Sequence, residues 1–125
     1  MVLKEMDPKG IFNFEKLRVY RGSLEFSKEI YKLTKRFPKD ELFGVTSQLR
    51  RAATSVPLNI AEASGLTKKE FKSYLRRSRA SLYECVPLLE IALENRYVSE
   101  AQFKAMYQDS MKLAKSISAL IGSVK

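Results

Sequence analysis

The sequence lacks histidine altogether and has a single cysteine, Cys85. Without histidine it cannot carry a Ser–His–Asp triad, an HExxH zinc site or the Glu-x-x-His pairs of di-iron helix bundles. One cysteine excludes an internal disulfide and is typical of a protein of the reducing cytoplasm. The five glycines are not clustered, and neither GxxxxGK[ST] nor GxGxxG occurs, so no phosphate-binding loop is indicated. We therefore expect no catalytic residues, no metal site and no cofactor.

No apolar run approaches the roughly 20 residues that span a bilayer. The N-terminus also lacks the apolar core of a secretion signal. We therefore expect a cytoplasmic protein with no membrane partner. Lysine and arginine total 23 against 14 aspartates and glutamates, a formal net charge of +9 at pH 7. This excess favours nucleic acids or acidic proteins as partners, although a basic surface can also serve solubility alone.

Three breaks divide the chain into segments whose apolar residues recur every three or four positions, as on one face of an α-helix. The breaks lie at 37–40, 64–67 and 95–99. The segments predict helices over 14–37, 41–64, 68–95 and 100–122. Asp40 is the candidate cap of the second helix. Thr67 with Glu70, and Ser99 with Gln102, have the spacing of a capping box before the third and fourth helices.

Four long helices with short connections predict an all-α fold, an antiparallel up-down four-helix bundle over residues 14–122. Residues 1–13 show no sustained period and predict a loose N-terminal arm. The apolar stripe of the third helix is expected at Phe71, Tyr74, Ser78, Leu82, Cys85, Leu89 and Ala92. That of the fourth is expected at Phe103, Met106, Ser110, Ala114, Ile117 and Ile121, supported by Tyr107, Met111 and Leu120. Because Cys85 lies on such a stripe, we interpret it as a packed thiol rather than a nucleophile.

The first predicted helix has two opposed apolar faces. One face, expected in the core, consists of Val19, Phe26, Ile30, Leu33 and Phe37. The second face consists of Leu17, Tyr20, Leu24 and Tyr31. One helix of a four-helix core buries a single face, so the second must rest on the N-terminal arm or meet another subunit. We predict that these four residues form an oligomer interface, with the arm contact as the alternative.

The most basic segment is the start of the third helix, 67-TKKEFKSYLRRSRASL-82. Its cations, with Glu70 as the single acid, are Lys68, Lys69, Lys72, Arg76, Arg77 and Arg79. Four of them are spaced four, four and three residues apart and form a ridge: Lys68, Lys72, Arg76 and Arg79. Like charges at this spacing repel each other, and a phosphate backbone would relieve that repulsion. We predict nucleic-acid contact at all six cations; the alternative is a solvated charged face.

The second helix adds Arg50 and Arg51, which lie off its apolar stripe. Arg51 shares an outer face with Glu62, so we interpret it first as part of an Arg–Glu ion pair, within the helix or between subunits; nucleic-acid contact at Arg50 and Arg51 is the alternative prediction. Pro57 removes one N–H and sets its ring against the carbonyl of Ala53, so this helix is expected to bend. The bend either shapes the helix for its neighbours or is a tolerated kink. Pro87 in the third helix poses the same problem.

The segment 50-RRAATSVPLNIAEASG-65 closely resembles the signature of the 23S rRNA intervening-sequence protein family, also called four-helix bundle proteins. Other segments similar to that family are LRVY at 17–20, EIYKLTKRFP at 29–38, FGVTSQL at 43–49, KKEF at 68–71 and YVSEAQF at 97–103. The resemblance implies a small basic bundle without catalytic activity that assembles as a ring, typically a homopentamer. It also implies an association with insertions in bacterial large-subunit rRNA. A similar fold serves diversity-generating retroelements, where it engages nucleic acid and a reverse transcriptase.

Two positions depart from the family pattern. Ala63 stands where the family usually has glycine, and 75-LRRSRA-80 is more basic than its counterpart in most members. The second departure favours stronger polyanion binding by this chain. We therefore expect a non-catalytic, basic, homo-oligomeric bundle that binds RNA or another nucleic acid electrostatically. The alternative is a structural or adaptor ring that docks an acidic protein.

Overall fold

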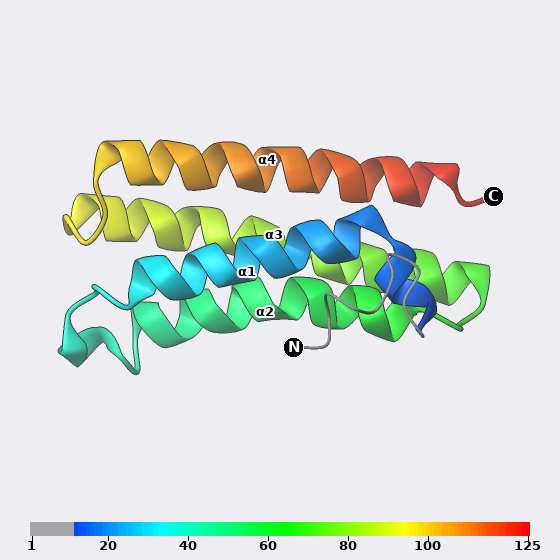
Figure 1. Cartoon of the computed structure of the whole chain (residues 1–125), viewed down its shortest axis with the longest axis horizontal. Coiled ribbons are helices and arrows are strands. Elements are labelled where there is room, and N and C mark those ends of the chain that lie inside the picture. Colours follow the sequence, from blue (N-terminus) through cyan, green and yellow to red (C-terminus); the bar gives the residue numbers. More distant parts are fainter. Residues whose placement is uncertain (1–11) are drawn as a thin grey trace.

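The computed structural model describes residues 12–125 (Figure 1). Its elements are the 3-10 turn η2 (Asn13–Lys16), α1 (Arg18–Thr34), the 3-10 turn η3 (Lys39–Glu41), α2 (Val45–Ala63), α3 (Lys68–Glu94) and α4 (Glu100–Ser123). The helices run in alternating directions, and no strand occurs among the described residues. The predicted all-α, up-down four-helix bundle is confirmed. Most of the predicted N-terminal arm, residues 1–11, lies outside the described part.

The helices pack unevenly around one core. α2 makes the most extensive contact with α3 and also packs along α1, whereas the contact between α1 and α4 is the smallest among neighbouring helices. In Figure 1, α4 lies at the top and α2 at the bottom, on opposite sides of α1 and α3. The largest side chains without solvent exposure are Ile30, Leu49, Ile60, Leu75, Leu82, Leu89 and Ile117. They come from all four helices, so a single continuous core holds the bundle.

Capping boxes mark the starts of two of the helices. Thr67 and Ser99 cap α3 and α4 as predicted, through reciprocal hydrogen bonds with Glu70 and Gln102. The predicted start of the second helix at 41, with Asp40 as its cap, is wrong: Lys39–Glu41 form η3, and α2 begins at Val45 after Gly44. The Glu41 carboxylate accepts hydrogen bonds from the Val45 amide (3.4 Å) and the Tyr97 hydroxyl (2.7 Å). Glu41 therefore covers the start of α2 and ties it to the α3–α4 connection.

The first predicted helix is also too long. Leu17 takes an extended conformation between η2 and α1, and α1 ends at Thr34 rather than at residue 37. The predicted core stripes are wrong at a few positions in α3 and α4. Leu75 rather than Tyr74 is fully buried in α3, and Leu113 is buried in α4 while Tyr107 and Met111 are 44% and 45% exposed. Neighbouring helix positions differ by only about 100°, so periodicity alone does not choose between Tyr74 and Leu75.

Pro57 lies inside α2, which remains helical from Val45 to Ala63. Proline has no N–H for the carbonyl four residues earlier, which belongs to Ala53. The hydroxyl of Ser27 on α1 donates a hydrogen bond to this carbonyl at 2.9 Å, in a buried position. The neighbouring helix therefore replaces the hydrogen bond that Pro57 removes. Pro87 in α3 is exposed, as is Tyr83 four residues before it, so solvent can reach that turn.

Cys85 belongs to the core, with no exposed surface. Burial, together with the neighbouring Glu84 carboxylate, raises the pKa of its thiol to about 12. A thiol with so high a pKa is protonated at neutral pH and is a poor nucleophile. This agrees with the interpretation of Cys85 as a packed thiol.

Replacing Ser27 with alanine should lower the free energy of unfolding by about 1–3 kcal/mol, because the buried Ala53 carbonyl loses its partner. In a Pro57→Ala background the restored amide of residue 57 can donate a hydrogen bond to this carbonyl. Ser27→Ala should therefore lower the free energy of unfolding by less in that background. Denaturant unfolding of the four proteins in this double-mutant cycle measures the difference. Ser116→Ala, which removes an exposed bond to the Lys112 carbonyl, is the matched control. Equal losses in both backgrounds would contradict the role assigned to Ser27.

Cys85 should resist iodoacetamide at pH 8 in the native protein and react fully in denaturant. The pKa of this thiol is about 12 in the folded protein, against an ordinary value of 9.0 for an exposed thiol in the unfolded chain. Its contribution to stability is therefore present below pH 9 and lost as the pH rises from 9 to 12. Unfolding of the wild type and Cys85→Ala over pH 8–11 should show a steeper alkaline loss for the wild type. Parallel profiles, or rapid native labelling, would show an accessible thiol.

Candidate functional site

The basic segment forms the first half of α3. Its single acid, Glu70, is occupied by the helix cap: the Glu70 carboxylate accepts hydrogen bonds from the Thr67 amide (3.2 Å) and hydroxyl (2.9 Å). Lys68, Lys69, Arg76 and Arg77 are exposed, and Lys72 and Arg79 are half-buried. The segment therefore presents its cations to solvent while its acid is engaged in the helix start.

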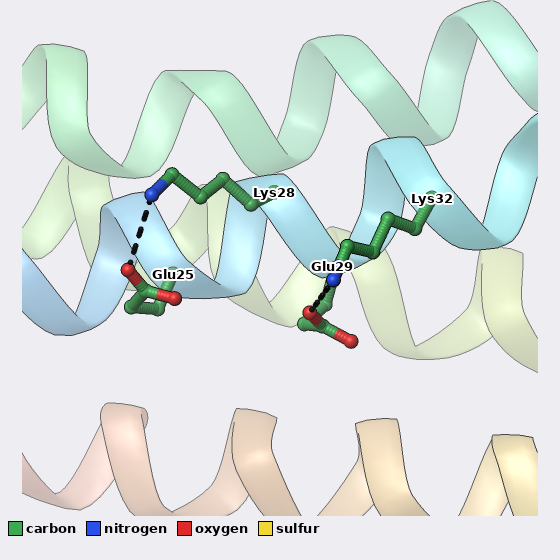
Figure 2. A network of polar contacts seen from close by, with 4 residues as sticks. All are labelled: Glu25, Lys28, Glu29 and Lys32. Carbon is green, nitrogen blue, oxygen red and sulfur yellow. Dashed lines mark hydrogen bonds and ion pairs between the residues drawn. The ribbon is translucent and has the colours of Figure 1, made fainter. Parts of the chain in front are cut away.

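No carboxylate neutralises these six cations within residues 12–125. The ion pairs of the described chain are Lys28–Glu25 (3.3 Å) and Lys32–Glu29 (3.4 Å). Figure 2 shows both pairs on α1, where the two glutamates lie on the side that faces α4. The positive charge of α3 is therefore uncompensated by the rest of the described chain.

The six cations of α3 do not all point in the same direction. Helical spacing places Lys68, Lys72, Arg76 and Arg79 on neighbouring positions of one side of α3, and we call these four residues the α3 ridge. The guanidinium of Arg79 donates a hydrogen bond to the Ser118 hydroxyl of α4 at 2.9 Å, so this end of the ridge lies at the α3–α4 seam. Arg77 points elsewhere, with its guanidinium 4.6 Å from the centre of the Tyr74 ring. Sequence spacing thus identified the ridge but not the separate position of Arg77.

Arg50 and Arg51 lie on α2 and do not join this ridge. Arg50 donates a hydrogen bond to the Thr34 hydroxyl (2.8 Å), and its guanidinium lies 4.7 Å from the centre of the Tyr31 ring. Arg50 therefore helps to join α2 to α1. Arg51 is exposed and forms no ion pair with Glu62 in the described chain. Eleven residues along a helix span roughly 16 Å, which is too far for that pair within one helix.

The second face of α1 is divided. Leu17 and Tyr20 are half-buried and pack against the core of their own chain. The ring of Phe14, from η2, meets Tyr20 edge-on at 4.9 Å. Leu24 and Tyr31 instead line a shallow groove of about 630 Å³ along the outside of α1. Contact with the preceding segment therefore accounts for Tyr20, while Leu24 and the part of Tyr31 that Arg50 does not cover line the outer surface of α1.

A second apolar groove lies between α3 and α4, and sequence reasoning missed it. It has a volume of about 650 Å³ and is lined by Tyr83, Val86, Tyr107 and Met111, among others. The side chains of Tyr83, Tyr107 and Met111 are 55%, 44% and 45% exposed. The signal present in the sequence was an apolar stripe on the fourth helix that is wider than one buried face.

The described residues contain no group of three or more His, Cys, Asp or Glu side chains placed to hold a metal ion. None of their helices combines the length and apolar character needed to cross a membrane.

Comparison with known proteins agrees with this architecture. The model of the family described as 23S rRNA-intervening sequence protein matches residues 15–119. A crystal structure of a protein of unknown function from the S23 ribosomal protein family of Bacteroides thetaiotaomicron is similar, with 26% sequence identity and a TM-score of 0.78. The similarity covers 84% of this chain and 96% of that one. No curated protein matches. The chain belongs to the 23S rRNA-intervening sequence protein family.

Proposed function

We propose that this chain is a non-catalytic, cytoplasmic, basic bundle that binds RNA, or another nucleic acid, through the phosphate backbone along the α3 ridge. One observation carries the proposal: the ridge cations have no carboxylate partner in the described chain, and Glu70 is engaged by Thr67. Cations held in a row along a rigid helix repel one another, and a polyanion relieves this repulsion while releasing its counterions. The family description, which names an rRNA insertion, supports RNA as the class of polyanion.

The proposed contact depends on the charge of the phosphates rather than on the base sequence. Lysines are flexible point charges that bind phosphates without selecting a base. The two arginines of the ridge, Arg76 and Arg79, lie on the outside of a bundle, and Arg79 is already bound to Ser118. Affinity is therefore expected to depend strongly on salt and weakly on sequence.

We also propose that the chain self-associates through the α1 groove at Leu24 and Tyr31, as the resemblance to ring-forming proteins suggests. Each added copy repeats the α3 ridge. Several weak phosphate contacts on one assembly raise the apparent affinity without any new interaction, provided that one nucleic acid reaches them together.

An acidic protein is the second candidate partner of the ridge. The observation that favours it is the apolar groove beside the ridge, because exposed Tyr83 and Tyr107 are typical of protein–protein contacts. In this reading the bundle is an adaptor, and the cations orient an acidic segment over the groove. Nucleic-acid binding and adaptor binding both weaken with salt, so salt dependence alone does not distinguish them.

Replacing Lys72, Arg76 and Arg79 with glutamate should abolish nucleic-acid binding and leave the bundle folded, because none of the three is a core residue. The Lys72 and Arg76 pair alone, which spares the Arg79–Ser118 bond, should weaken binding in the same direction. The matched control replaces three exposed lysines, Lys39, Lys104 and Lys112, with glutamate, which changes the net charge by the same amount as the triple variant of the ridge.

Fluorescence anisotropy with structured RNA, single-stranded RNA and duplex DNA near physiological salt measures this loss. For duplex DNA, the slope of log affinity against log salt should become shallower by roughly 0.9 for each lost phosphate contact. An equal loss in the control would show that net charge matters and the ridge does not. If heparin competes equally well and no nucleic acid binds more tightly than about 10⁻⁴ M, the adaptor function replaces this proposal.

Leu24→Ser combined with Tyr31→Ser should lower the mass of the assembly in light scattering at tens of micromolar. The helical circular dichroism should change little, because neither residue is in the buried core. A wild-type protein that is already a monomer of 14.3 kDa under these conditions would refute the proposed self-association.

A further inference from the structure

Charge is segregated along α3. Its first half carries the α3 ridge, whereas residues 83–95 contain three glutamates and no lysine or arginine. Glu84, Glu90 and Glu94 are all exposed, and none has a cation within ion-pair distance in the described part of the chain. The second half of α3 would therefore repel the phosphate backbone that its first half is proposed to bind.

The same half of α3 also exposes apolar side chains. Tyr83 is 55% exposed and Ile91 44% exposed, and both lie beside the glutamates on the outer side of the helix. The apolar groove toward α4 continues this surface through Tyr107 and Met111, with Lys115 as its charged lining residue. We call Tyr83, Glu84, Glu90, Ile91 and Glu94, with this groove, the acidic-apolar face. A large apolar patch rimmed by charge is typical of an interaction surface.

The outside of α1 has the opposite charge around a similar apolar centre. Four cations, Arg21, Lys28, Lys32 and Lys35, line the shallow α1 groove around Leu24 and Tyr31, against a single acid, Glu25. Two of these cations are paired with Glu25 and Glu29, but the four side chains involved are 48–74% exposed (Figure 2). Exposed pairs of this kind contribute little stability, so the lysines can exchange their partners on binding.

α1 and α3 occupy diagonal corners of the bundle. Each packs against α2, and the two make no contact with each other within the described ranges. The outer sides of the two helices therefore point away from each other, and one chain cannot bring its α1 groove onto its own acidic-apolar face. A contact between these surfaces requires a second copy of the chain.

We propose that the acidic-apolar face of one copy receives the α1 groove of a second copy. This inference rests on the self-association proposed above and names the surface that Leu24 and Tyr31 meet. Tyr31 and Leu24 pack against Tyr83, Ile91 and the neighbouring groove, and the lysines of α1 meet the glutamates of α3. Because the two surfaces differ, the contact is head-to-tail and repeats from copy to copy, closing into a ring where the rotation allows.

This arrangement explains why the two charged halves of α3 do not compete. The acidic half is covered by the next copy, and the α3 ridge stays open for a polyanion. Charge complementarity also selects the pairing: two α1 grooves repel each other, as do two acidic-apolar faces.

The test pairs two complementary variants. Leu24→Ser with Tyr31→Ser disables the α1 groove, and Tyr83→Ser with Ile91→Ser disables the acidic-apolar face. Each variant alone should be a monomer of 14.3 kDa, because its single intact surface has no counterpart. Mixed in equal amounts they should form a one-to-one heterodimer and nothing larger, since each pair retains one complete contact. Native mass spectrometry and analytical ultracentrifugation measure the species.

A second pair of variants tests the charges. One variant carries Lys28→Glu with Lys32→Glu, and the other carries Glu90→Lys with Glu94→Lys. In each variant alone, the dissociation constant of the assembly should be at least tenfold higher than in the wild type. A mixture of the two should assemble again, because each copy then meets a neighbour of opposite charge on both sides. Glu62→Lys with Asp40→Lys makes the same change of charge as the Glu90 and Glu94 variant at exposed residues that line neither groove, and should assemble as the wild type does.

The proposal is overturned if the Tyr83 and Ile91 variant assembles like the wild type, or if the mixed variants stay monomeric. Circular dichroism of each variant confirms that a monomer is folded. The α3 ridge is intact in all these variants, so their binding to RNA is measured independently by anisotropy. Loss of assembly with residual RNA binding supports both proposals, whereas restored assembly without any RNA binding refutes the nucleic-acid function alone.

Discussion

The buried hydrogen bond from the Ser27 hydroxyl to the Ala53 carbonyl joins α1 to the turn of α2 that Pro57 deprives of a bond. A second serine, Ser78 of α3, donates to the Val56 carbonyl of the same region at 2.8 Å. α2 is thus held from both sides by hydroxyls, inside a core that contains its proline. Both bonds fix the position of α2 between α1 and α3, and the diagonal arrangement of those two helices follows from it.

That arrangement decides what the outer surfaces can do. α1 and α3 each bury one side against α2 and turn the other outward, so their exposed charges and apolar residues face different directions. On α3 the capping box holds the Glu70 carboxylate at the start of the helix, where it forms no ion pair with the ridge. Like-charge repulsion along the ridge weakens the helix. The cap and the Arg79–Ser118 bond offset part of that cost and keep the cations in place before any partner arrives.

Segregation of charge along α3 lets one helix serve two kinds of contact. Its basic half suits a polyanion, and its acidic half with Tyr83 and Ile91 suits the basic outside of α1. An assembly built in this way would present one ridge for each copy. Assembly and nucleic-acid binding then support each other through multivalency, although each has its own residues.

The sequence by itself determined the four helices, the capped starts of α3 and α4, the up-down order and the spacing of the α3 ridge, because all of these depend on local periodicity and capping. The tertiary structure alone decided which of two adjacent residues, such as Tyr74 or Leu75, faces the core, and left Tyr107 and Met111 at the surface. It also decided that Tyr20 packs within its own chain, that Arg50 binds Tyr31 and Thr34, and that Ser27 replaces the bond lost at Pro57. These depend on which neighbour covers a given side of a helix, and helical periodicity specifies a direction but not the partner that lies there.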